Sequence, residues 1–237
     1  MPADVIDYEL IGDDLQMVVI TLDPGEAVLA EAGAMCYKTS GIEIDTRMDP
    51  HGQGGFFNSI FRAGKRVLTG ESFFQNTYYV EGTAGQIALA PGVPGDIIPY
   101  EMQNEVLIME RGAYLGHIGD IETSVSFEGF RGVFAEGLLA LQVTGTGLLF
   151  FNAYGDVQEI AVDGNYTVDS GYAVAWQASL DYSIGRTGRS ISSFLFGDQL
   201  ISRYHGKGKL WVQTRSPRTL ASWIHPFRRV KSNTPNQ

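Results

Sequence analysis

The sequence predicts an all-β protein, and both its composition and its pattern of apolar runs lead to that prediction. Glycine accounts for 29 of the 237 residues, and only 19% of the residues are charged. Glycine is disfavoured in helices and supplies the backbone conformations of tight turns, so this composition is typical of many short strands. Short apolar runs also alternate with glycine and Pro-Gly signals along the chain, as they do in β-sandwiches.

One strand pattern occurs three times, at residues 70–76, 147–152 and 208–214. In each copy a glycine precedes an apolar and aromatic run that ends in an amide or hydroxyl residue. Other landmarks recur at a similar spacing, such as Gly33 and Gly112, which lie 79 positions apart. We therefore expect three tandem β-sandwich modules in a pseudo-threefold arrangement, because half-buried modules must cover one another's apolar faces.

The predicted first module spans residues 1–105 and begins with a hairpin. An apolar run at residues 15–22 precedes a turn in which Pro24 already has the backbone angle that the turn needs. In the segment 41–45, Ile42 and Ile44 alternate with acids, so both isoleucines are expected to face the core. Further strands are expected at residues 28–37, 70–80, 85–92 and 94–99.

Residues 49–69 are the least strand-like part of the chain. A glycine-rich loop at residues 51–55 leads into residues 56–62, whose apolar spacing predicts a short helix. The loop does not match a phosphate-binding loop, because no Gly-Lys-Ser/Thr follows it.

The predicted second module spans residues 106–170, and the third spans 171–216. The second opens at residues 106–114 with a repeat of the pattern at 28–35, and the third opens with an alternating strand at 171–176. A basic tail at residues 217–237 follows the last strand.

No catalytic, metal or cofactor-binding residues are expected from the motifs. The four histidines have no metal-site spacing, and Cys36 has no second cysteine with which to bind zinc. A cupin enzyme, whose repeats share turns like Pro94-Gly95-Asp96, would need a His-x-His pair that the chain lacks. No Gly-x-Ser-x-Gly nucleophile motif occurs. A catalytic set dispersed along the sequence stays open.

Several single residues carry specific expectations. Cys36 is expected to be a small buried residue rather than a nucleophile. Trp176 and Trp211 lie in predicted strands, so core packing is expected for both. Three acids could in principle serve acid and base chemistry, but solvent-facing or salt-bridged positions near Arg66 and Arg111 are favoured. These acids are Glu31, Glu71 and Glu110.

The charge of the chain is divided between two regions. Residues 1–198 hold nine bases and all 27 acids, a net charge of −18, whereas residues 199–237 hold eight bases and no acid, a net charge of +8. An acidic body repels phosphate, so no nucleic-acid partner is expected. The N-terminus lacks the basic start of a secretory signal, and a lone cysteine agrees with a reducing compartment, so a cytoplasmic location is expected.

The basic tail combines apolar and cationic residues. Leu220, Trp223, Ile224 and Phe227 fall at helical spacing, next to Arg228 and Arg229. Such a segment could contact an anionic membrane surface or a protein. We favour docking on the acidic body or on a neighbouring subunit, with Trp223 and Phe227 buried, because Pro226 limits the helix to about two turns and short segments bind membranes weakly.

Four motifs occur in order along the chain: Glu31-Ala32-Gly33-Ala34-Met35, Gly70-Glu71-Ser72-Phe73-Phe74, Pro94-Gly95-Asp96-Ile97 and Lys209-Leu210-Trp211-Val212-Gln213-Thr214-Arg215. As a set they resemble the altered-inheritance-of-mitochondria family, in its uncharacterised bacterial branch. The resemblance implies three tandem modules like the tryptophan RNA-binding attenuation protein (TRAP-like), related to the double-stranded β-helix. It implies no catalytic residues. The inner-membrane role of the mitochondrial members is not transferred to this chain.

These observations favour a non-enzymatic scaffold or interaction protein that forms a homo-oligomer through its β repeats. Membrane contact is expected only through the tail, if at all. The alternative is a small-ligand-binding protein or enzyme with a dispersed site between modules, whose ligand the motifs do not identify. Thermal stabilisation by a metabolite would favour that alternative.

Overall fold

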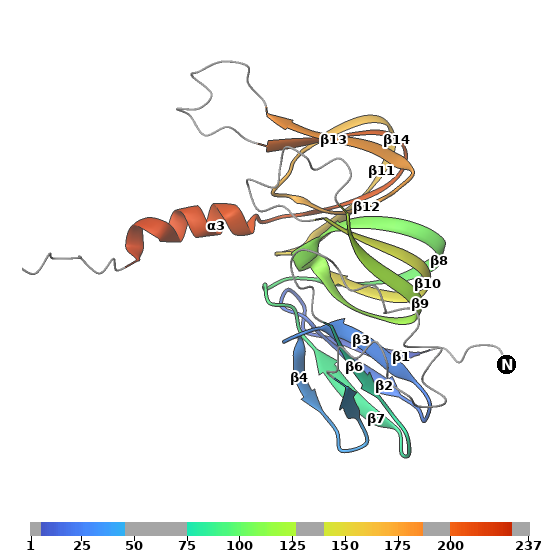
Figure 1. The fold of residues 1–237 in the computed structure, drawn as a ribbon. Helices are drawn as coiled ribbons and strands as arrows, with labels where there is room; N and C mark the ends of the chain where they lie inside the picture. The colour runs from blue at the N-terminus through green and yellow to red at the C-terminus, as the bar shows by residue number, and fades with distance from the viewer. Residues whose placement is uncertain (1–5, 46–74, 127–139, 187–199, 229–237) are drawn as a thin grey trace, which may run out of the picture.

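A computed structural model describes residues 6–45, 75–126, 140–186 and 200–228, and in these residues the chain is all-β, as predicted. Fourteen strands form two sheets, and every pair of neighbouring strands runs antiparallel. Figure 1 shows the strands in three groups that lie one above another, with a single helix projecting from them. None of the described helices is long and apolar enough to span a membrane.

The smaller sheet has four strands in the order β1-β2-β7-β4. Their bounds are β1 (Asp7–Ile11), β2 (Met17–Leu22), β7 (Gly85–Leu89) and β4 (Met35–Lys38). The predicted turn joins β2 to the next strand: the backbone N–H of Glu26 donates to the Asp23 carbonyl at 2.9 Å, and Gly25 has a φ of +93°. The turn is as predicted, but the hairpin across it is wrong, because β2 and the strand that follows the turn lie in different sheets. The hairpin that opens the chain is formed by β1 and β2.

The larger sheet has ten strands, nine of which follow the order β11-β14-β12-β8-β10-β9-β3-β6-β5, while β13 pairs with β14. The bounds of these strands, in chain order, are β3 (Ala27–Glu31), β5 (Glu43–Asp45), β6 (Gln75–Tyr79), β8 (Ile97–Glu110), β9 (Tyr114–Ser126), β10 (Ala140–Asn152), β11 (Val157–Asp169), β12 (Ala173–Gln177), β13 (Leu180–Arg186) and β14 (Leu200–Gln213). The helical elements among the described residues are η2 (Arg111–Ala113), α3 (Pro217–Ile224) and η4 (His225–Phe227).

Three hydrophobic clusters fill the space between the strands. The first is centred on β2, β3 and β7, the second on β8, β9 and β10, and the third on β11, β12 and β14. Trp176 is 4% exposed in the third cluster, and Trp211 is 2% exposed in the second, so both are core residues as predicted. Because Trp211 belongs to β14, the last strand also helps to build the middle core.

Strongly curved strands connect these clusters (Figure 1). The strands β8, β9, β10, β11 and β14 are each 13 or 14 residues long, and each contains a residue with positive φ. These residues include Asn104, Gly119, Gly145, Gly164 and Gly206. A left-handed backbone bends a strand and is favourable mainly for glycine. The bends let one strand contribute to more than one part of the sheet.

The strand pairs β5–β6, β9–β10 and β13–β14 each flank an internal stretch outside the described residues. The repeat, its pseudo-threefold relation and its boundaries stay predictions. The predicted loop and helix at residues 49–62 and the glycine that opens the segment 70–76 lie outside the described residues.

Two expectations about the first module are wrong. Ile42 is fully buried, but Ile44 is 38% exposed, because the strand begins only at Glu43 and the alternation does not extend back to Ile42. Cys36 is exposed rather than buried. It lies in the edge strand β4, where the pairing with β7 shifts register between Met35 and Tyr37. A register shift changes the direction in which the neighbouring side chain points relative to the sheet, and Cys36 lies at this shift.

Candidate functional site

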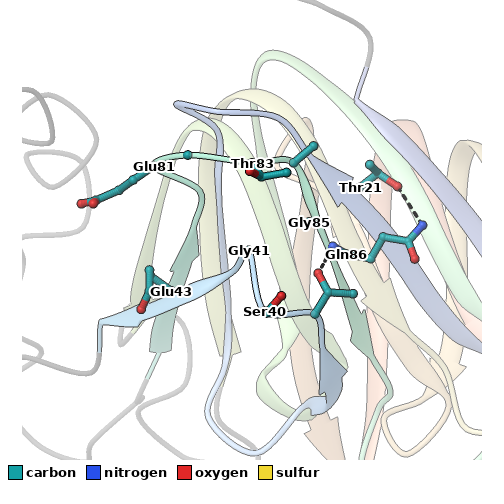
Figure 2. Close-up of a pocket in the computed structure, with 11 residues that line it drawn as sticks. Thr21, Ser40, Gly41, Glu43, Glu81, Thr83, Gly85 and Gln86 are labelled. Atoms are coloured by element: carbon teal, nitrogen blue, oxygen red, sulfur yellow. Dashed lines mark hydrogen bonds between the residues drawn. The ribbon is translucent and has the colours of Figure 1, made fainter.

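The most evident hollow of the described surface lies at one end of the first group of strands (Figure 2). It has a volume of about 620 Å³ and lies between the β4–β5 connection, the β6–β7 turn and the ends of β2 and β7. Its lining is rich in hydroxyl groups and contains two acids and no base: Thr21, Thr39, Ser40, Gly41, Glu43, Glu81, Gly82, Thr83, Ala84, Gly85 and Gln86. Most of these residues are exposed, so the hollow is open to solvent.

Two hydroxyl groups of this hollow are paired with Gln86. The backbone N–H of Gln86 donates to the Thr39 hydroxyl at 2.9 Å, and its side-chain amide donates to the Thr21 hydroxyl at 3.3 Å. Within the part of the chain that the structure describes, no three His, Cys, Asp or Glu side chains lie close enough together to hold a metal ion. The hollow therefore presents no convergent reactive set.

A buried polar cluster lies where β3 meets β9, between the first and second hydrophobic clusters. The Tyr114 hydroxyl lies 2.7 Å from Nδ1 of His117, and it accepts a hydrogen bond from the Gln75 amide, also at 2.7 Å. Tyr114 is fully buried and His117 is 2% exposed. The same hydroxyl donates toward the Leu29 carbonyl at 3.4 Å. This cluster ties together strands that are far apart in sequence.

Sequence reasoning missed this cluster, because residues three positions apart in a regular strand face opposite sides of the sheet. In β9 the pairing with β10 shifts register between Phe150, which pairs with Gly116, and Phe151, which pairs with Tyr114. The extra residue on β9 turns Tyr114 toward the side that His117 occupies. A bulge of this kind leaves no readable sign in the sequence.

Glu31 and Glu110, which are 79 positions apart in the sequence, lie close enough to interact electrostatically near this cluster. Burial raises the pKa of Glu31, the Arg111 guanidinium opposes that change, and the Glu110 carboxylate adds to it. Burial also raises the pKa of Glu110, while the N–H of Gly112 donates to this carboxylate and lowers the pKa. Glu31 therefore lies near Glu110 and Arg111. Glu31 and Glu110 are both partly buried, whereas the sequence favoured solvent-facing or salt-bridged positions. Glu71 and Arg66 lie outside the described residues.

A second polar cluster lies where β12 meets β8. The Glu105 carboxylate accepts hydrogen bonds from the Gln177 amide at 3.0 Å and from the Tyr100 hydroxyl at 3.2 Å. The Gln177 carbonyl oxygen in turn accepts from the backbone N–H of Lys209 at 2.9 Å. Burial, together with the Glu105 carboxylate, raises the pKa of Tyr100 to about 12. In both clusters the polar atoms satisfy one another, so they join strands and leave little hydrogen-bonding capacity for a substrate.

The buried imidazole of His117 should make stability depend on pH. Burial lowers its pKa from 6.5 to about 4, so between these values the unfolded chain binds a proton that the folded chain does not. Stability should therefore fall as the pH drops, by about 2 kcal/mol between pH 7.5 and pH 5 from this group alone. Urea unfolding of the wild type and of His117→Gln at both pH values measures this contribution.

Glu31 and Glu110 act in the opposite direction, because a raised carboxyl pKa stabilises the fold as the pH falls. Both glutamates are present in the wild type and in His117→Gln, so their contributions cancel when the two proteins are compared. The contribution of His117 is the pH dependence of the unfolding free energy of the wild type minus that of His117→Gln. An identical pH dependence in the two proteins would show that His117 is not held neutral by burial.

A C-terminal helix forms, as the apolar spacing predicts, and it begins with a side-chain cap. The Ser216 hydroxyl accepts from the backbone N–H of Thr219 at 3.4 Å, and Pro217 occupies the first turn. The helix α3 ends at Ile224, shortly before Pro226, and η4 continues the chain. Its apolar side chains share one face and are all exposed: Leu220 is 39% exposed, Trp223 67%, Ile224 46% and Phe227 74%.

The expected burial of Trp223 and Phe227 on the body of the same chain is wrong. Ser216 is buried and anchors the start of the helix, but α3 then leaves the strands and projects away from them (Figure 1). The two aromatic rings contact each other, with centroids 5.7 Å apart. Arg228 is exposed, and Arg229 lies outside the described residues. Docking on a neighbouring subunit stays a prediction.

Comparison with known proteins places the strands of this chain in a family. The family model described as mitochondrial biogenesis AIM24 matches residues 8–215. The chain belongs to the AIM24 family. The family resemblance seen in the ordered motifs is thereby confirmed. The match ends at Arg215, directly before the helix cap Ser216, so AIM24 membership describes the strands and not the C-terminal segment.

Relatives of this AIM24 protein come from Streptococcus pyogenes. An uncharacterised protein of serotype M6 is 27% identical over 221 residues, which cover 92% of this chain and 88% of that protein. The X-ray crystal structure of an S. pyogenes protein is similar with a TM-score of 0.77 and 25% identity, covering 94% of this chain and 100% of the other. These likenesses agree with the all-β fold.

Proposed function

We propose that this AIM24-family protein is a non-enzymatic interaction protein that self-associates through its C-terminal segment, defined here as α3 and η4. The observation that carries this proposal is the exposed apolar face of that segment. Trp223 and Phe227 are its most exposed members, and contiguous apolar surface exposed to water favours burial in an interface. Aromatic anchors of this kind contribute strongly to protein contacts.

Charge supports a protein partner for this segment. No acid follows Asp198, and the last 39 residues carry eight bases, whereas the preceding part of the chain has a net charge of −18. Opposite charges of this size attract copies of the chain to one another. Binding of a small ligand has less support, because the hollow is open to solvent and both polar clusters pair their groups internally.

Location and partners complete the proposal. An exposed free thiol, Cys36, is compatible with a reducing compartment, so we place the protein in the cytoplasm. The acidic body repels phosphate, so nucleic acid is not among the proposed partners.

Deletion of residues 217–237 tests the proposal. Light scattering should show the wild type as an oligomer, and the deletion variant should have the mass of a single chain with unchanged far-ultraviolet circular dichroism. The double variant Trp223→Ala/Phe227→Ala should behave in the same way, because it removes the exposed aromatic anchors.

The control is Tyr37→Ala, since Tyr37 is 43% exposed but lies on β4, outside the C-terminal segment. This variant should remain oligomeric. A wild type of single-chain mass at about 100 μM, the concentration at which weak self-association begins to populate oligomers, would contradict the proposal. Flotation of that single chain with vesicles of anionic phospholipid would assign the segment to a membrane instead.

A further inference from the structure

The hairpin formed by β1 and β2 carries a second exposed apolar surface. Ile11 on β1 is 39% exposed, and Leu15 in the connecting turn is 69% exposed. Tyr8 is 42% exposed but lies three positions before Ile11 in a regular strand, so it faces the other side, where its ring packs edge-on to Phe150. Asp13 and Asp14 lie in the same turn as Leu15, and both are exposed. We call Ile11, Asp13, Asp14 and Leu15 the hairpin patch. It has the same mixture of apolar and charged groups as the C-terminal segment, but with the opposite sign of charge.

The sequence on both sides of the hairpin patch is acidic. The described chain from residue 6 onward contains seven acids before its first base, Lys38. Asp7 and Glu9 add two exposed carboxylates on β1 itself. In contrast, the C-terminal segment and its flanks contain no acid, and Arg228 follows directly after Phe227. The two surfaces are therefore complementary in charge, and each exposes apolar side chains that water solvates poorly.

We infer that the C-terminal segment of one copy docks on the hairpin patch of a second copy. In this interface Trp223 and Phe227 cover the apolar residues of the hairpin patch, while Arg228 faces the turn that contains Asp13 and Asp14. This inference rests on the proposed self-association and names the surface that receives the segment. The occupant is a second copy of this chain, because the chain itself carries both the basic segment and the acidic surface that is complementary to it.

The contact joins different copies because the two surfaces are separated within one chain. In Figure 1 the helix α3 points away from the strands toward the left, whereas β1 lies on the right of the lowest group of strands. Ser216 at the start of the helix is buried against the body, and the helix points away from β1. Docking then links copies either reciprocally in a dimer or head to tail in a larger assembly.

Charge also distinguishes the hairpin patch from the other exposed edge of the same sheet. The strand β4 exposes Met35 and Tyr37, but it ends in Lys38 and carries no acid. A basic segment gains nothing electrostatically from that edge. The strand β1 pairs only with β2 among the described strands, so its outer side is open to a neighbouring molecule.

Charge reversal on each surface tests the inference. The tail variant is Arg228→Glu/Arg229→Glu, and the hairpin variant is Asp13→Lys/Asp14→Lys. Each variant alone should associate at least tenfold more weakly than the wild type in sedimentation velocity, because like charges then face each other. An equimolar mixture of the two variants should associate again, since the reversed charges are opposite. Circular dichroism confirms that each variant is folded.

A matched control reverses two exposed acids elsewhere. Asp120 and Glu122 are exposed on β9, and Asp120→Lys/Glu122→Lys changes the net charge by the same amount as the hairpin variant. This control should associate like the wild type. If the control and the hairpin variant weaken association equally, net charge and not the hairpin patch is responsible, and the inference fails.

The outcomes separate this inference from the proposed function. If the deletion of residues 217–237 abolishes association but the hairpin variant assembles like the wild type, the segment docks elsewhere and only the inference is overturned. If the deletion leaves association intact, both the inference and the proposed function fail. Mutual rescue in the mixture, with neither variant associating alone, supports both.

Discussion

Replacing Gly145 with alanine should lower the free energy of unfolding by roughly 3 kcal/mol or more, because two independent costs coincide at this position. Gly145 lies in β10 with a φ of +140°, a conformation that L-residues other than glycine adopt only with strain. A Cβ atom added there would also lie 2.0 Å from the backbone carbonyl oxygen of Asp120 in the neighbouring strand. A backbone atom cannot rotate away, so β9 or β10 must shift.

Gly164→Ala is the matched control for that prediction. Gly164 also lies within a long strand at positive φ, +109°, but an added Cβ would meet nothing within 4 Å. Only the backbone strain remains, so the loss should be about 1 kcal/mol. Urea or guanidinium unfolding measures both variants. Equal losses in the two would show that the close approach of β9 and β10 does not require glycine at position 145.

Truncation of Trp211 should destabilise the protein by roughly 3–5 kcal/mol, the usual range for removing a large buried aromatic side chain. The Trp211 ring lies edge-on to Tyr100 and Phe151, at centroid distances of 5.2 and 5.6 Å. It is 2% exposed and reaches from β14 into the second hydrophobic cluster. Trp211→Ala therefore leaves a cavity at the contact between the last strand and the middle core.

Trp223→Ala removes the same side chain from an exposed position, since Trp223 is 67% exposed. In a single chain its free energy of unfolding should change by less than about 0.5 kcal/mol. Both variants are measured at a concentration low enough to prevent association, so that the role of Trp223 in an interface does not contribute. A loss for Trp223→Ala as large as that for Trp211→Ala would mean that the helix packs on its own body.

These experiments separate two roles of aromatic residues in the chain. Trp176 and Trp211 hold strands together, whereas Trp223 and Phe227 are available to a partner. A protein whose two polar clusters are paired internally and whose exposed C-terminal segment is aromatic and basic is suited to binding other macromolecules. The polar clusters around Tyr114 and Glu105 then serve mainly to join strands of neighbouring hydrophobic clusters.

The sequence by itself determined the features that depend on local chemistry. Glycine content and short apolar runs predicted the all-β fold, and Pro24 with Gly25 predicted the first turn. The spacing of Leu220, Trp223 and Ile224 predicted the short C-terminal helix. Each of these features follows from the backbone preferences of a few neighbouring residues, which act in the same way whatever surrounds them.

Only the tertiary structure decided which side chains meet and which remain in water. Register shifts exposed Cys36 and brought Tyr114 to His117, although the spacing in the sequence indicated otherwise. The nearness of Glu31 to Glu110 required pairing between strands far apart in the chain. Trp211 and Trp223 both lie in apolar sequence patterns that predicted burial, yet Trp211 is buried and Trp223 is exposed. The physical reason is that the burial of a side chain depends on which other segments pack against it. The local sequence of a strand does not show where a bulge will form or which strand will cover it.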